Sequence, residues 1–142
     1  YSSDPAAILQ KTFDNPEKYS EPVVLRDISF VSHCEHHLAP INGFVDIAYV
    51  PSEQIVGISK IARVVECFAR RLQTQETMTA QIANCIQDNL MPNGTAVRSR
   101  ATHACMTNRG VCKSGALLTA TTFKGVFLSD LALKHQFLNG QI

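Results

Sequence analysis

The chain has 142 residues, 13 Lys and Arg against 12 Asp and Glu, and a formal net charge of +1. This length fits a single domain that can bury a real core. The balanced charge argues against a general nucleic-acid or membrane-surface role. No segment approaches the roughly eighteen continuous apolar residues of a membrane span, and no secretory signal pattern opens the chain. We therefore expect a cytoplasmic protein without nucleic-acid or membrane partners.

The five cysteines are an odd number with irregular spacing, which makes a poor disulfide framework and fits a reducing cytosol. Cys67 and Cys85 lie inside apolar helical patterns, so we expect them to be small buried hydrophobic residues. The first residue is Tyr1 rather than Met, and we expect that something upstream has been removed or left out.

In chain order, residues 1–22 predict one brief helix followed by a loop, because three X-Pro pairs surround a short apolar patch. Residues 23–32 are rich in Val, Ile, Leu and Phe and predict a strand, and residues 43–50 alternate in the manner of a second strand. The segment 34–40 therefore lies in the connection between two antiparallel strands, where functional groups are commonly presented.

Residues 54–58 predict a short extended piece, after which Ser59 is a suitable N-cap for a helix with one buried stripe. Thr74 or Thr77 can start a second helix, which the 92–94 Pro-Asn-Gly sequence ends. Residues 95–106 and 117–126 predict two further strands, and 129–139 a closing helix. The order ββααββ predicts an α+β fold: an antiparallel four-stranded sheet with two long helices on one face. So thin a unit favours assembly with copies of itself.

The most informative stretch is Ser-His-Cys-Glu-His-His-Leu-Ala-Pro at 32–40. Thiolate and imidazole ligands suit zinc, and the spacing of Cys34 and His37 lets both meet one ion. Cys105 is a third candidate ligand, and His103 falls on the same strand face two residues earlier. With three protein ligands, the zinc would keep a position open for water. With His103 as a fourth ligand, the zinc would be a structural site that links the loop to the strand. The remaining alternative is that these Cys and His residues bind no metal.

Several polar groups accompany this stretch. His36, next to a candidate ligand, can serve as a proton donor or acceptor, or it is an exposed loop histidine. Lys60 and Arg63 begin a helix, where an anion is favoured, and Arg109 follows Cys105 in a turn. These three either hold a phosphate chain or are solvated surface charges.

The Gln75–Glu76 pair lies between the two long helices. A carboxylate beside an amide can recognise a purine edge, because the carboxylate accepts hydrogen bonds from paired N–H donors. Alternatively, Glu76 only stabilises the first turn of the next helix. Both readings stay open at this point.

Four motifs in this order resemble the GTP cyclohydrolase I family, from about residue 23 to the C-terminus. They are the 32–40 stretch, Gly-Ile-Ser-Lys-Ile-Ala-Arg at 57–63, Phe-Ala-Arg-Arg-Leu-Gln-Thr-Gln-Glu at 68–76 and Thr-His-Ala-Cys-Met-Thr-Asn-Arg-Gly-Val at 102–111. The resemblance implies a zinc enzyme with an open site, whose ligands are Cys34, His37 and Cys105.

By that resemblance the substrate is GTP and the products are 7,8-dihydroneopterin triphosphate and formate. Zinc activates a water for attack on C8 of guanine, and His103 protonates the adjacent ring nitrogen. His36 and Ser59 lie near the ribose, where ring opening, rearrangement and reclosure need proton transfers. The resemblance assigns the guanine edge to Gln75 and Glu76, and the triphosphate to Lys60, Arg63 and Arg109.

The resemblance also implies the tunnelling fold and a toroidal homodecamer with active sites shared between neighbouring subunits. Family members carry a longer helical region before the position of residue 1, which this sequence lacks. Two alternatives remain: a binding or regulatory module that keeps zinc as a four-ligand staple, and a tunnelling-fold nitrile reductase, which relies on a nucleophilic cysteine without catalytic zinc.

Overall fold

The computed structural model describes residues 3–104 and 116–142. Its elements, in chain order, are α1 (Pro5–Ile8), β1 (Phe13–Asp14), β2 (Val23–Cys34), β3 (Pro40–Val50), β4 (Gln54–Ile55), α2 (Ile58–Ala69), β5 (Leu72–Gln73), α3 (Gln75–Leu90), β6 (Gly94–His103), β7 (Leu118–Gly125), α5 (Val126–Ser129) and α6 (Leu131–Leu138). The ββααββ order expected from the sequence is therefore present.

The main sheet has the strand order β5-β2-β3-β6-β7. The four long strands are antiparallel neighbours, and β5 adds two residues parallel to the end of β2. A register shift between Leu25 and Ile28 marks a β-bulge in β2, where Asp27 has a φ of 57°. The short strands β1 and β4 form a separate antiparallel pair.

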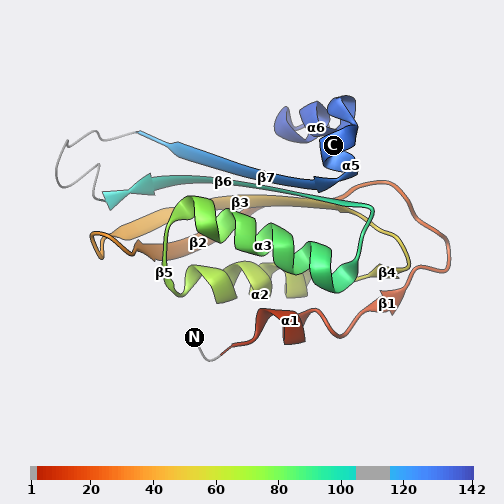
Figure 1. Ribbon diagram of the computed structural model, residues 1–142, viewed down its shortest axis with the longest axis horizontal. Helices are drawn as coiled ribbons and strands as arrows, with labels where there is room; N and C mark the ends of the chain where they lie inside the picture. Colours follow the sequence, from red (N-terminus) through yellow and green to blue (C-terminus); the bar gives the residue numbers. More distant parts are fainter. Residues whose placement is uncertain (1–2, 105–115) are drawn as a thin grey trace.

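The two long helices lie on one face of the sheet, and α5 and α6 lie on the other (Figure 1). The alternation along β6 explains how both faces are covered. Val97 and Ala101 join the helix-side core with Ile82 and Ile86 of α3. Ala96, one residue out of phase, joins Phe127 and Phe137 beneath α5 and α6. Both faces of this strand are therefore buried along part of its length.

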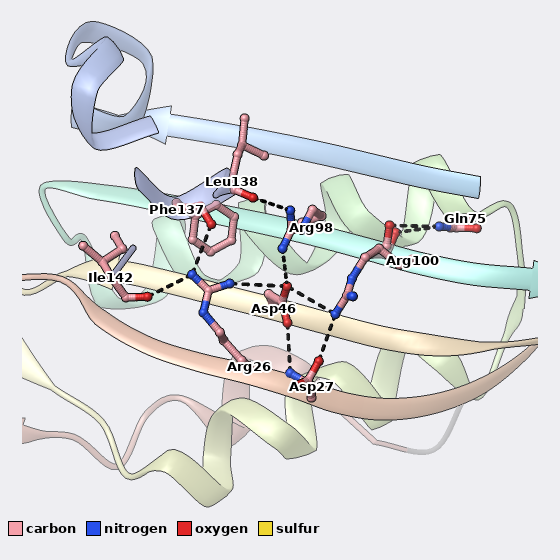
Figure 2. A network of polar contacts seen from close by, with 10 residues as sticks. Arg26, Asp27, Asp46, Gln75, Arg98, Arg100, Phe137, Leu138 and Ile142 are labelled. Atoms are coloured by element: carbon pink, nitrogen blue, oxygen red, sulfur yellow. Dashed lines mark hydrogen bonds and ion pairs between the residues drawn. The ribbon is translucent and has the colours of Figure 1, made fainter. Parts of the chain in front are cut away.

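A polar network fastens the C-terminal segment to this second face (Figure 2). Asp46 is 1% exposed, and its carboxylate lies 2.9 Å from the Nη2 of Arg98 and 3.5 Å from guanidinium nitrogens of Arg26 and Arg100. Arg26 and Arg98 also donate to the backbone carbonyls of Phe137, Leu138 and Ile142. One buried carboxylate thus organises three arginines, two of which hold the chain end in place.

The structure corrects several boundaries. Ser59 is not the N-cap of α2: the helix begins one residue earlier, at Ile58, behind Gly57, which has no side chain to cap it. Thr74 does cap α3, because its hydroxyl accepts a hydrogen bond from the N–H of Thr77. The expected closing helix over 129–139 corresponds to α6, which the side chain of Asp130 caps, and the four-residue helix α5 before it was not expected. Within the described residues, the third long strand ends at His103.

Candidate active site

The candidate groups gather at one end of the sheet. Cross-strand pairing aligns Ser32 of β2 with Ile41 of β3, and Ile41 with His103 of β6. At the same end, Cys34 pairs with Gln73 of β5, directly before the start of α3. In Figure 1 the β2–β3 loop, β5, the start of α3 and the end of β6 all lie at this end of the molecule.

The loop after β2 has a closed shape. The N–H of Cys34 donates to the carbonyl of Ala39 at 2.9 Å, and the N–H of Leu38 donates to the carbonyl of Cys34 at 2.8 Å. Leu38 has a φ of 55°, a left-handed conformation that costs a non-glycine residue about 1–2 kcal/mol. The two backbone bonds hold this unfavourable turn, which brings the side chain of His37 back over Cys34.

Cys34 and His37 form the first part of the expected metal site. The Cys34 Sγ lies 3.8 Å from the His37 Nδ1. Sulfur and nitrogen on one tetrahedral zinc, at about 2.3 and 2.0–2.1 Å from the ion, lie about 3.6 Å apart. The pair therefore fits zinc in chemistry and in spacing. Cys105, the third expected ligand, lies outside the described residues, and residues 3–104 and 116–142 contain no cluster of three or more potential metal ligands.

His103 lies at the same end of the sheet, in a partly buried position. Its Nε2 is 2.8 Å from the Oε1 of Gln75, the first residue of α3. Burial lowers the pKa of His103 below its usual value, and the nearby Glu76 carboxylate opposes that shift. The ring is therefore mainly neutral at pH 7. This hydrogen bond occupies the Nε2, so that nitrogen is not available as a metal ligand.

Gln75 differs from the expectation that its side chain reads the guanine edge. The residue is 1% exposed, and its amide is hydrogen-bonded to Ser99, to the carbonyl of Leu118 and to His103. The first position of α3 is turned toward β6, so both N–H donors of this amide and one acceptor position of its oxygen are engaged within the chain. Glu76, in contrast, is exposed in the first turn of the same helix.

His36 points away from the enclosed part of the site. Its side chain is 68% exposed, and its Nε2 lies 3.9 Å from the carboxylate of Glu35. The ring meets His37 edge-on, with the centroids 6.4 Å apart. In this chain, His36 is thus positioned next to the metal pair but open to a ligand arriving from solvent.

The expected phosphate-binding residues of α2 are not brought to this end within one chain. Ile58 and Ile61, at the start of α2, line a small cavity with Val23 and Tyr49, at the opposite end of the sheet from Cys34. Ser59 and Lys60 lie with them in the first turn of α2, about 15 Å from the helix end at a rise of about 1.5 Å per residue, and Arg63 lies about halfway along the helix. Ser59 and Arg63 are exposed and Lys60 is half-buried. Arg109 lies outside the described residues.

Comparison with known proteins decides what this arrangement belongs to. The sequence model of GTP cyclohydrolase I matches residues 1–141. The "GTP cyclohydrolase 1" of Hyphomonas neptunium is 53% identical over 139 residues, covering 98% of this chain and 68% of that protein. The protein of the same name from Bartonella quintana is 51% identical over 138 residues, with coverages of 97% and 67%. The chain belongs to the GTP cyclohydrolase I family.

The expectation of an enzyme of the GTP cyclohydrolase I family is thereby confirmed, and the match includes the first 22 residues, which the sequence motifs did not reach. The crystal structure of an archaeosine synthase QueF-Like in the apo form has a TM-score of 0.61 at 14% identity, covering 73% of this chain and 93% of its own. That likeness concerns the fold alone, and it agrees with the expected tunnelling fold. None of the helices that the structure describes has the length and hydrophobicity of a membrane-spanning segment.

Proposed function

We propose that this chain catalyses the zinc-dependent hydrolysis of GTP to 7,8-dihydroneopterin triphosphate and formate, the first step of pterin biosynthesis. The observation that carries the proposal is the meeting, at one end of the sheet, of a Cys34–His37 pair at zinc-ligand spacing with a histidine held by Gln75. Family membership supplies the substrate, because the relatives are named for it.

Zinc held by Cys34, His37 and Cys105 would supply a Lewis acid that makes water nucleophilic near neutral pH. His103 would move a proton at the guanine ring nitrogen beside C8. A histidine with a lowered pKa is neutral before the reaction and can accept and return a proton during it. His36, exposed beside the metal pair, would exchange protons with the opened ribose.

Glu76 would hold the guanine edge. Its carboxylate is exposed at the start of α3, close enough to His103 to influence that residue's pKa. A carboxylate accepts two hydrogen bonds from the neighbouring N–H donors of guanine, which adenine does not present in that pattern. The peptide N–H groups of the first turn of α3 favour a negative charge at this position. Gln75 contributes indirectly, through His103.

A complete site would need a second copy of the chain. Ser59 and Lys60 are at the far end of α2 and Arg63 is about halfway along it, so a neighbouring subunit would present them to the triphosphate at this end, together with Arg109. The sheet has edges suited to such assembly: within the described part of the chain, β2 pairs with β3 on one side but has no strand neighbour on the other side along residues 23–32, and β7 forms the opposite edge. Continuing the sheet between subunits would build a closed ring, here a homodecamer.

The test is incubation of the zinc-loaded, assembled protein with GTP, followed by oxidation and detection of a fluorescent pterin. Formate should appear in equal amount. Protein treated with a chelator, and the Cys34→Ser variant, should give neither product until zinc is restored to the former. A zinc-loaded assembly that released no formate from GTP would refute the proposal.

A further inference from the structure

We infer that Thr79, Ser99 and Gln75 form a one-way hydrogen-bond relay that fixes His103 as its Nε2–H tautomer, so that only Nδ1 can exchange protons with a substrate. Gln75 is thus a positioning residue. The catalytic consequence rests on the proposed function, whereas the relay itself is a property of the folded chain.

The direction of each hydrogen bond follows from the one before it. The Thr79 hydroxyl lies 2.7 Å from the Gln75 backbone carbonyl, which only accepts, so Thr79 must donate there. The Thr79 and Ser99 hydroxyls are 2.7 Å apart, and since the Thr79 proton is already used, Ser99 donates to Thr79. The Ser99 oxygen can then only accept from the Gln75 amide, 2.9 Å away. The amide group facing Ser99 is therefore the Nε2.

Two carbonyls give the same amide orientation independently. The Gln75 Nε2 lies 2.9 Å from the carbonyl oxygen of Leu118 and 3.2 Å from that of Ser99. Turning the amide over would set its oxygen against both carbonyls and leave buried acceptors facing one another, at a cost of about 1–3 kcal/mol for each unsatisfied group. The orientation is thus determined from two sides.

With the Nε2 facing the sheet, the Oε1 of Gln75 faces His103, 2.8 Å from the ring Nε2. An amide oxygen cannot donate, so the ring nitrogen must carry the hydrogen. A neutral imidazole has one N–H, which leaves Nδ1 unprotonated. No residue that the structure describes pairs with Nδ1, and it is therefore the nitrogen that takes and gives protons.

Burial makes the relay rigid. Thr79 and Gln75 are 1% exposed and Ser99 is 0% exposed, so water does not compete for these bonds. Partners of this kind, which orient a catalytic or metal-binding histidine, typically change activity 10- to 100-fold when they are removed. The relay also keeps the His103 Nε2 away from the metal pair.

The test is nitrogen NMR of the zinc-loaded assembly with ¹⁵N-labelled histidine rings, in mildly alkaline buffer where His103 is neutral. The protonated and unprotonated ring nitrogens resonate far apart, and the His103→Ala spectrum assigns the signals. Wild type should show a single Nε2–H form. Gln75→Met should show both tautomers, with zinc content and KM little changed and kcat lowered about 10- to 100-fold.

The matched control is Gln73→Met, because Gln73 is 4% exposed and its side-chain amide donates to Phe68 and Gln81 and not to His103. It should leave the His103 tautomer unchanged. A proton on Nδ1 in wild type, or an unchanged spectrum in Gln75→Met, would overturn the relay. The wild-type measurement decides the question even if Gln75→Met does not fold. If the spectra behave as stated but no pterin forms, the proposed function fails and the relay stands. If pterin forms but the His103 proton is on Nδ1, the proposed function stands and the relay fails.

Discussion

Replacing Asp46 with Asn should weaken the attachment of the C-terminal helices. The substitution keeps the size of the side chain but removes the negative charge at the centre of the arginine network. Asp46 is 1% exposed and accepts hydrogen bonds from Arg98 and from the backbone N–H of Asp27, both at 2.9 Å. The Arg98 and Arg100 Nε groups already lack a partner among the described residues, so the network has no spare acceptor to offer.

The magnitude follows from the bonds that are lost or weakened. A charge-assisted hydrogen bond contributes about 1.5–3 kcal/mol and a neutral one about 0.5–1.5 kcal/mol. Removing one partner of a buried ion pair costs about 3–5 kcal/mol, but the arginines here are partly exposed, so we expect about 3 kcal/mol. At about 2.1 cal/mol/K per residue, the unfolding entropy of 142 residues is about 0.3 kcal/mol/K, and Tm should fall by about 10 °C.

The assay is thermal and urea unfolding of wild type and Asp46→Asn under identical zinc and protein concentrations. The matched control is Asp27→Asn, which removes a carboxylate bound to Arg100 at 2.9 Å but 70% exposed. Asn tolerates the positive φ at this position, and an exposed pair contributes only about 0–1 kcal/mol. Equal losses in the two variants would refute the view that burial of Asp46 makes its charge decisive.

Three further predictions concern pH, metal and backbone. Burial alone would raise the pKa of Asp46, but the Asp27 N–H and the arginines outweigh it and the pKa is lowered. The ionised carboxylate therefore stabilises the folded state fully above the unfolded pKa of about 3.9, and this stabilisation is lost as pH falls through the lower folded pKa. Unfolding measured at a series of acidic pH values should show this loss. Cys34→Ser should lose zinc and activity together, whereas His103→Ala should keep zinc by elemental analysis and lose turnover; equal loss of zinc would contradict these roles. Gly43→Ala should destabilise the fold by about 1–3 kcal/mol in urea unfolding, because its Cβ would lie 2.1 Å from the Arg100 carbonyl oxygen; an unchanged midpoint would contradict this.

The sheet was predictable because its strands have strong local signals. Alternation over 43–50 and the β-branched run over 23–32 predicted β3 and β2, and the structure extends β2 to Cys34. The extension could not be read from the sequence, since His33 and Cys34 have no apolar pattern. Their strand conformation comes from pairing with β5 and β3, which is a tertiary effect.

The sequence predicted which side chains gather at the site, but not which partners those side chains face. The sequence assigned Gln75 to a base because a carboxylate follows it, whereas its partner Ser99 is 24 residues away and is reached only by folding. One signal existed: Ser99 is a polar residue on the strand face shared by Val97 and Ala101, which are buried against the helices. A polar residue on such a face requires a buried partner, and the start of α3 provides it.

The Asp46 network was missed for a related reason. Asp46 lies on the strand face of Ala48 and Val50, which belong to the core with Phe127 and Phe137. The aligned arginines of β2 and β6 become neighbours only through the register, in which Asp46 pairs with Arg98. Charge patterns along one strand do not show which charges will face each other across a sheet.

The two residues of β5 connect parts of the molecule that are otherwise separate. Through the N–H of Glu35, which donates to the carbonyl of Gln73 at 3.0 Å, the loop that bears the cysteine–histidine pair is joined to the residue that immediately precedes the N-cap of α3. This short link therefore ties the metal-side half of the candidate site directly to the start of the helix that carries Gln75 and Glu76.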